Sequence, residues 1–269
     1  MTDRAIDPQA LRDQYGTAAK LRDRQESHRL YSEDATDFVA RILAHLDLHP
    51  GLRLVDVGCG PGMYHPALGR SGVRVVAIDP PPAMAREASH QATTHGLAVH
   101  AVRAGAEALP LPDAGLDRAM ANHVLYHVPD RLRALRRVLK PGGRMVLATN
   151  AVDSLGRLLN LHADAARELG HSPTPPPDVR FSLDDLPLVR EVFPTAQRHV
   201  LPNAFRFPTT EAALRYYASG FVDDIERPAD DGSHRDGLLR EVGRRIEEIV
   251  RREGHFRVEK VAGCFVAKV

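Results

Sequence analysis

A glycine turn behind an apolar run is the feature that most restricts what this chain can fold into. In the stretch LVDVGCGPGMY, Gly58, Gly60 and Gly62 follow a short strand-like segment that carries one acid, Asp56. Glycines at this spacing allow a tight turn and a close approach of the backbone to a ligand. The third glycine of the dinucleotide pattern GxGxxG would fall at Met63, so the turn favours a cofactor without a pyrophosphate.

Short β-rich runs alternate with helical stretches after this point. The runs LRLVDVG, VRVVAID, AVHAVRAG, LDRAMANHV and GRMVLAT are separated by segments of helical or turn pattern. Near-continuous apolar strands are typical of a parallel sheet covered by helices on both faces. We therefore expect an α/β fold, a Rossmann-like doubly wound sheet, with its ligand at the carboxyl ends of the strands, where Gly58, Asp79 and Asn122 fall.

Four regions follow one another along the chain. Residues 1–50 predict an N-terminal helical arm over the cofactor, and residues 51–150 predict the cofactor-binding core. Residues 151–194 contain the proline-rich break HSPTPPPD and are too long for an ordinary connection, so we expect a lid. Residues 195–269 predict the C-terminal part of the sheet with substrate-side helices.

Composition restricts the partners and the compartment. The chain has 36 basic and 35 acidic residues and a net charge of +1, which supplies no general field for nucleic-acid phosphates. Cys59 and Cys264 are its only cysteines, so thiols can build neither a disulfide framework nor a zinc site. The first residues are charged where a signal peptide is apolar, and no apolar run is long enough to span a membrane. We expect a cytoplasmic monomer or homodimer without nucleic-acid, membrane or metal partners.

A second acid narrows the choice of cofactor. Asp79 ends the run VRVVAID, where an acceptor can bind both ribose hydroxyls of an adenosine. Asp79 alone does not separate NAD from S-adenosylmethionine, because both contain that ribose. Asp56 does favour S-adenosylmethionine, since a carboxylate beside the turn suits a cofactor with an ammonium and a sulfonium group.

Four ordered motifs together resemble a known family. VDVGCGPG, AIDP, AEALPLPDAGLDRAMANHVLYHVPD and LKPGGRMVLAT, within residues 52–150, are similar to the class I S-adenosylmethionine-dependent methyltransferases, in particular the type 11 small-molecule branch. The resemblance implies a seven-stranded sheet whose last strand is antiparallel. It also implies methyl transfer from S-adenosylmethionine to a small, partly apolar metabolite, with natural-product biosynthesis as one setting.

The resemblance also implies a set of cofactor-binding residues at the strand ends. Asp56, Gly58 and Gly60 would surround the methionine moiety, and Asn122 would face the sulfonium together with His123. The implied residues of the core are Asp56, Gly58, Gly60, Asp79, Pro80, Ala106, Glu107, Asn122 and His123. Many relatives have an aspartate at the adenine, where this chain has Gly105, so the adenine contact is expected from backbone groups or from Glu107.

His123 and His127 are the candidate catalytic residues. They lie four apart in NHVLYHVPD, and an imidazole can act as general base near neutral pH. A structural role for His127 before Pro129 is an equal alternative. Many methyl transfers need no dedicated base, because the sulfonium is already an activated donor.

Aromatic residues outside the core have two interpretations each. Tyr15, Arg29 and Tyr31 on the N-terminal arm are expected to cover or bind the cofactor, or else to pack as an amphipathic helix. A second group either lines an apolar acceptor pocket or packs as core. Its members are Phe205, Phe207, Tyr216, Tyr217 and Phe221.

Two other classes of function stay open on the sequence. The chain could methylate a macromolecule, RNA or protein, although its charge balance and lack of an appended basic region argue against RNA. It could also be an S-adenosylmethionine-binding module without catalysis. A nicotinamide dehydrogenase is the weakest alternative, because the GxGxxG pattern is broken at Met63.

Overall fold

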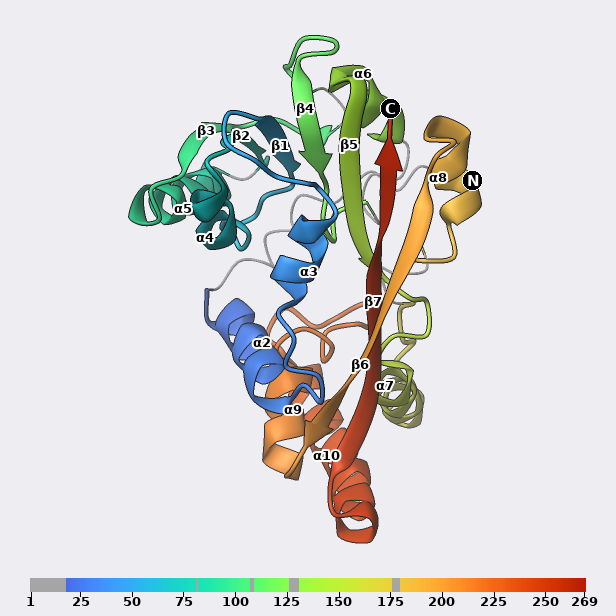
Figure 1. The fold of residues 1–269 in the computed structure, drawn as a ribbon. Helices are drawn as coiled ribbons and strands as arrows, with labels where there is room; N and C mark the ends of the chain where they lie inside the picture. Colours follow the sequence, from blue (N-terminus) through green and yellow to red (C-terminus); the bar gives the residue numbers. More distant parts are fainter. Residues whose placement is uncertain (1–17, 81, 107–108, 126–130, 176–179) are drawn as a thin grey trace. The chain divides into compact units, whose positions relative to one another are not determined.

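The chain forms two compact units. The computed structural model describes residues 18–80, 82–106, 109–125, 131–175 and 180–269, and Figure 1 draws the fold. The first unit, called the sheet unit, comprises Thr36–Val152, Pro177–Leu201 and Ala262–Val269. The second, called the helical unit, comprises Met1–Ala35, Asp153–Pro176 and Pro202–Val261. The expected lid thus has its first part in the helical unit and its last part in the sheet unit, and its role as a lid stays a prediction.

Seven strands form one sheet in the part of the chain that the structure describes, in the order β3-β2-β1-β4-β5-β7-β6. The strands are β1 (Arg53–Val57), β2 (Arg74–Ile78), β3 (Ala98–Val102), β4 (Leu116–Met120), β5 (Leu139–Asn150), β6 (Gln197–Phe207) and β7 (Phe256–Lys268). Strands β1 to β5 pair in parallel, and β7 pairs antiparallel with β5. The predicted seven-stranded α/β sheet with an antiparallel last strand is therefore confirmed.

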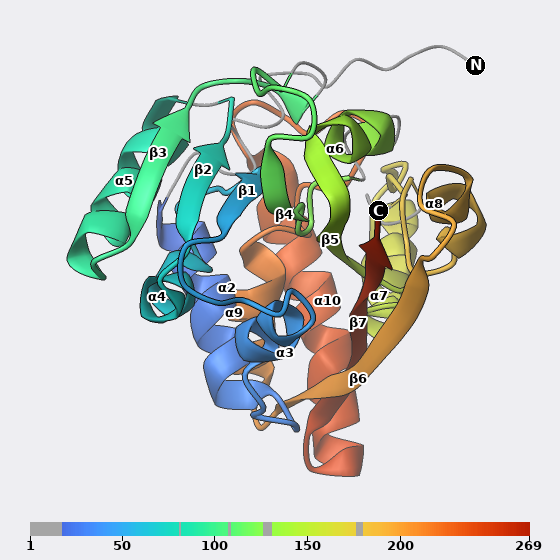
Figure 2. The same cartoon turned by 45° about the horizontal axis from the view of Figure 1, so that its top comes forward.

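The order of the strands creates a place for a ligand. β1 lies between β2 and β4, so the chain reverses its direction of progress through the sheet at this point, as the row of strands in Figure 2 shows. The crevice beyond the carboxyl ends of strands at such a reversal is where doubly wound sheets bind ligands. The glycine turn follows β1 directly, and Asp79 follows β2.

Helices cover the sheet unit. They are α3 (Phe38–Ala44), α4 (His65–Leu68), α5 (Pro82–Thr94), α6 (Leu132–Val138) and α8 (Leu186–Val192), with a short 3-10 turn, η1 (Gly69–Ser71), after α4. The Asp37 side chain caps α3 by accepting the Ala40 N–H at 3.2 Å, which satisfies one of the free donors of the first turn.

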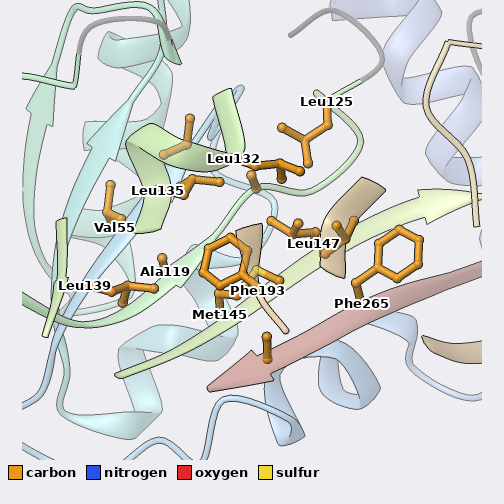
Figure 3. Close-up of a cluster of buried hydrophobic side chains, with 14 of the residues drawn as sticks. Val55, Ala119, Leu125, Leu132, Leu135, Leu139, Met145, Leu147, Phe193 and Phe265 are labelled. Atoms are coloured by element: carbon orange, nitrogen blue, oxygen red, sulfur yellow. The ribbon is translucent and has the colours of Figure 1, made fainter. Parts of the chain in front are cut away.

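Each face of the sheet has its own apolar core, because successive side chains of a strand point to opposite faces. Val55, Ala119 and Met145 pair across β1, β4 and β5 and pack with residues of α6 and α8 (Figure 3). The residues next to them, Met120 and Val146, belong to the other core, with residues of α3, α4 and α5. Burial of these side chains stabilises the unit by about 25 cal/mol for each Å² of apolar surface removed from water.

The helical unit has a separate core. It contains α2 (Ala18–Tyr31), α7 (Gly156–Glu168), α9 (Thr210–Ala218) and α10 (Ser233–Glu253), with the adjoining parts of β6 and β7. Its buried rings are Phe205, Phe207, Tyr216 and Phe256, which contact one another, and Tyr217, which contacts His162. Among the described residues, no helix is both long enough and apolar enough to cross a bilayer.

Candidate active site

The glycine turn after β1 adopts a backbone that needs glycine. Gly58, Gly60 and Gly62 have φ angles of +68°, +53° and +88°, in the left-handed region that other residues disfavour. A Cβ built on Gly58 would lie 2.3 Å from Cγ1 of Val124, whereas a Cβ on Gly60 would meet no atom within 4 Å. The turn is thus tight against its neighbours at Gly58 and open at Gly60, which leaves room for a ligand beside Gly60.

Hydrogen bonds tie this turn to the end of β2. The backbone N–H groups of Gly58 and Cys59 both donate to the Ile78 carbonyl, at 2.7 and 3.1 Å. The N–H of Gly60 donates to Oδ2 of Asp79 at 2.8 Å. Sequence analysis assigned Gly58, Gly60 and Asp79 to one site, and the structure brings these three residues together.

Asp79 is a buried carboxylate with a shifted pKa. Its side chain is 8% exposed. The pKa of Asp79 is raised to about 6, mainly by burial and to a lesser extent by the nearby Asp56, while the hydrogen bond from Gly60 acts in the opposite direction. At neutral pH the group is therefore ionised but poorly solvated, which is a favourable state for accepting hydrogen bonds from hydroxyl groups.

Asp56 is more deeply buried than Asp79. It lies on β1 in register with Ala77 of β2 and Met120 of β4, in a row that is otherwise apolar. It is 2% exposed, and burial raises the pKa of its carboxyl while His65 opposes that rise. The Oδ2 atom of Asp56 lies 3.6 Å from Nε2 of His65.

Tyr64 and His65 were not among the predicted site residues. Both follow the last glycine of the turn, and both are buried on the same face of the sheet unit as Asp56. The local signal was a histidine three residues after Gly62, where α4 begins. The sequence did not reveal the partners of His65, because Asp56 lies on β1 and Ala88 lies on α5.

Four buried polar atoms at this end of the sheet unit have no hydrogen-bond partner among the described residues. They are Oδ2 of Asp56, the hydroxyl of Tyr64, Nε2 of His65 and Nδ2 of Asn122. Buried polar groups in native proteins nearly always have a partner, so such a group of atoms needs an explanation. The Asp56 oxygen and Nε2 of His65 face each other at 3.6 Å, whereas the Tyr64 hydroxyl and Nδ2 of Asn122 are available to polar groups of a cofactor such as its carboxylate.

Asn122 and His123 directly follow β4, and the main chain of β5 holds them. Oδ1 of Asn122 accepts the Ala148 N–H at 3.1 Å, and the His123 N–H donates to the Ala148 carbonyl at 2.8 Å. His123 has a φ of +57°, an unusual left-handed backbone for a residue with a side chain. Burial lowers the pKa of His123 to about 4, so its imidazole is neutral at physiological pH.

Other predicted site residues have different surroundings. Pro80 is exposed, with its carbonyl accepting from Nε of Arg103 at 3.2 Å, and Ala106 is half-buried beside the apolar core. Tyr15, Glu107 and His127 lie outside the described residues. Their assignments stay predictions.

Arg29 and Tyr31 lie on α2 in the helical unit. Arg29 is exposed and 3.9 Å from Glu26, and the Tyr31 ring packs on Phe207 with 5.3 Å between centroids. These contacts correspond to the packing alternative for the arm, and a role at the cofactor stays a prediction. The aromatic region that includes Phe205 and Tyr217 is the core of the helical unit, which favours core packing over an acceptor pocket for these rings.

Comparison with known proteins agrees with the observed fold and with the position of the glycine turn in it. Residues 55–147 match the family model described as a methyltransferase domain. A malonyl-[acyl-carrier protein] O-methyltransferase from Pseudescherichia vulneris is 33% identical, over 57% of this chain and 58% of its own length. A ubiquinone biosynthesis O-methyltransferase from Methylocella silvestris is 39% identical, over 37% of this chain and 40% of its own length. The crystal structure of the YcgJ protein from Bacillus subtilis shares the fold, with a TM-score of 0.59 at 17% identity over 86% of this chain and 97% of that chain.

The family-model match falls in the cofactor-binding region, residues 55–147. The chain spans between 37% and 58% of the lengths of the curated relatives that it matches. The matched residues 55–147 include the glycine turn, Asp79 and His123. Residues 55–147 thus carry a methyltransferase domain, and the predicted resemblance to the class I S-adenosylmethionine-dependent methyltransferases, with its cofactor, is confirmed.

Proposed function

We propose that this protein transfers the methyl group of S-adenosylmethionine to an oxygen of a small, partly apolar metabolite. The observation that carries the proposal is the contact between Gly60 and Asp79, which joins the glycine turn after β1 to the acid after β2. The unpartnered polar atoms at the same strand ends support it. The names of two relatives, both O-methyltransferases, support oxygen as the acceptor atom.

Each residue of the site has a proposed task toward the cofactor. Asp79 accepts hydrogen bonds from the ribose hydroxyls, and the open side of Gly60 lets the backbone approach the methionine moiety. Asp56 lies at the end of the site that would take the ammonium group, and Nδ2 of Asn122 is a free donor for a cofactor oxygen. Bound S-adenosylmethionine supplies a methyl group that is already activated by its positively charged sulfur.

The chain contributes mainly position and a suitable electrostatic environment. Orientation of an acceptor in line with a bond that will break can supply much of the acceleration of a displacement. The neutral ring of His123 adds no positive charge beside a cationic cofactor. A pKa of about 4 also makes His123 a weak base, so it suits an acceptor oxygen that is itself acidic, such as a carboxyl or a phenol.

A binding experiment tests the cofactor assignment. Isothermal titration calorimetry of the wild-type protein with S-adenosylhomocysteine, S-adenosylmethionine and NAD should detect binding of the first two alone. Asp79→Asn should weaken that binding by about tenfold or more, because hydrogen bonds to a charged group are the strong ones. Asp184→Asn is the matched control, since Asp184 is exposed and pairs with Arg198. No binding of either sulfur compound by the wild type would contradict the proposal.

A second experiment separates the acceptor classes. The protein is incubated with methyl-labelled S-adenosylmethionine and either a panel of small carboxylic acids and phenols, total RNA, or a protein mixture. Label in the small molecules supports the proposal, and label in RNA or protein supports the macromolecular alternative. Binding of the cofactor without transfer to any of the three supports the non-catalytic module. The cytoplasmic location and the oligomeric state stay predictions.

A further inference from the structure

The side chain of His65 contacts three parts of the sheet unit: the glycine turn, α5 and β1. It is the first residue of α4 and is 0% exposed. A Cβ built on Gly62 would lie 2.6 Å from Nδ1 of His65, so the imidazole packs directly against the last glycine of the turn. The same ring lies against α5 through the carbonyl of Ala88 and against β1 through Asp56.

Both ring nitrogens of His65 face acceptor oxygens. Nδ1 is 3.1 Å from the backbone carbonyl of Ala88, an oxygen that can only accept. Nε2 is 3.6 Å from Oδ2 of Asp56. Neither Nε2 nor that carboxylate oxygen has another partner among the described residues.

A neutral imidazole beside an ionised carboxylate cannot satisfy this arrangement. A neutral ring carries one proton, and whichever nitrogen bears it, the other nitrogen directs a lone pair at an oxygen acceptor. Water cannot easily relieve that repulsion, because His65 and Asp56 are both buried. The arrangement is satisfied when His65 and Asp56 together hold one proton more than a neutral ring and a free carboxylate.

We propose that His65 is a positioning residue of the cofactor site, whose Nδ1–H holds the Ala88 carbonyl and whose Nε2, through a shared proton, holds the carboxyl of Asp56. In this way the glycine turn is fixed between β1 and α5, and the orientation of Asp56 is set before the cofactor binds. The inference rests on the proposed function, because Asp56 is one of the residues assigned to the cofactor. His65 acts through Asp56 and Gly62.

Two substitutions separate the two contacts of the ring. The amide nitrogen of glutamine takes the place of Nε2, so His65→Gln retains a donor toward Asp56 and loses the donor to Ala88. The amide nitrogen of asparagine takes the place of Nδ1, so His65→Asn retains the donor to Ala88 and loses the contact with Asp56. His100→Asn is the control, because His100 is an exposed residue of β3.

The measurement is the dissociation constant of S-adenosylhomocysteine for each variant, with the melting temperature recorded in parallel. His65→Asn should bind about tenfold more weakly than the wild type, and His65→Gln within about threefold of it, because the contact with a charged group is the stronger one. In an Asp56→Asn background, His65→Asn should have no further effect on affinity. Lower melting temperatures with unchanged affinity, or equal losses in both variants, would show a purely structural histidine and overturn the inference.

A spectroscopic measurement on the wild type covers the case in which His65→Asn does not fold. In protein labelled with ¹⁵N at histidine and ¹³C at the aspartate carboxyl groups, the His65 and Asp56 signals, assigned by their loss in His65→Gln and Asp56→Asn, should show both ring nitrogens protonated, or a neutral ring beside a protonated Asp56. A neutral ring beside an ionised carboxylate overturns the inference. Failure of the wild type to bind S-adenosylhomocysteine would instead contradict the proposed function, and the ring signal would still report on the His65–Asp56 pair.

Discussion

The N–H of Gly60 donates to the carboxylate of Asp79 over 2.8 Å, and this bond joins the two loops that form the candidate cofactor site. Gly60 belongs to the turn after β1, and Asp79 directly follows β2. Because the donor is a backbone group in a left-handed residue, the position of the acid is coupled to the conformation of the turn. Asp79 therefore serves two purposes, holding the turn and offering its remaining acceptor positions to a ligand.

Replacing Asp79 by asparagine should stabilise the free protein and weaken ligand binding. The amide oxygen of asparagine can still accept the Gly60 N–H, while the unfavourable burial of a charge disappears. Since the folded pKa of about 6 lies above the usual value of 3.8, the folded protein binds the proton more strongly, and stability falls as pH rises from about 4 to 6.

The free energy of unfolding of Asp79→Asn at pH 7.5 should exceed that of the wild type by on the order of 2 kcal/mol. Urea denaturation at pH 4, 6 and 7.5 measures the difference in free energy of unfolding between the variant and the wild type. This difference should be smaller at pH 4 than at pH 7.5. A variant that is less stable than the wild type at pH 7.5 contradicts the prediction.

Substitutions in the glycine turn should differ in cost. Gly60→Ala places a methyl group in open space and should destabilise by about 1–2 kcal/mol through the left-handed backbone alone. Gly58→Ala should cost more, because its Cβ would also overlap Val124. Adding Val124→Ala should recover part of the loss at Gly58 and none at Gly60. Equal costs in urea titrations, or an equal effect of Val124→Ala in both backgrounds, would show that the overlap is unimportant.

His123 should remain neutral until the solution is strongly acidic. Its folded pKa of about 4 lies below the usual 6.5, so the unfolded chain binds the proton first, and stability is lost as pH falls from 6.5 to 4. In NMR titrations, the His123 ring signal should stay constant above pH 5. Asparagine tolerates a left-handed backbone, so His123→Asn should fold. The free energy of unfolding of this variant should fall less than that of the wild type between pH 6.5 and pH 4. A midpoint near 6.5 for His123 contradicts the prediction.

Lys260, in the helical unit, should titrate below the usual range of a lysine side chain. Its Nζ donates to Nδ1 of His28 at 3.0 Å and lies 4.1 Å from the centre of the Phe205 ring, with Ser32 as a further partner. Burial lowers the pKa of Lys260 to about 8. The folded state therefore binds this proton less strongly, and its destabilising effect is relieved as pH rises from about 8 to 10.5.

A carbon-detected NMR titration of the lysine side chains measures the pKa of Lys260 directly. The chain has few lysines, which makes assignment by single substitution practical: Lys20, Lys140, Lys260 and Lys268. Lys268 is exposed and serves as the internal control. If both lysines titrate at the same pH, burial does not shift Lys260 as expected.

Local patterns in the sequence were sufficient for the architecture of the sheet unit. Apolar runs separated by helical segments predicted parallel strands, because period and length are properties of neighbouring residues. The GxGxG turn and the acid at the end of VRVVAID predicted where Gly60 and Asp79 lie, since both directly follow strands whose carboxyl ends share one edge of the sheet.

Contacts between distant residues were decided by the tertiary structure. The bond from Gly60 to Asp79 and the approach of His65 to Asp56 and Ala88 join separate strands and helices, so no local pattern encodes them. Likewise, the aromatic residues of β6 and α9 form the core of the helical unit. The sequence identifies them as apolar, but it does not show which surface covers them. The sequence by itself determined the family, the order of elements and the turn that a cofactor needs. The tertiary structure decided which side chains become buried partners, because burial and pKa depend on the elements that fold against each group.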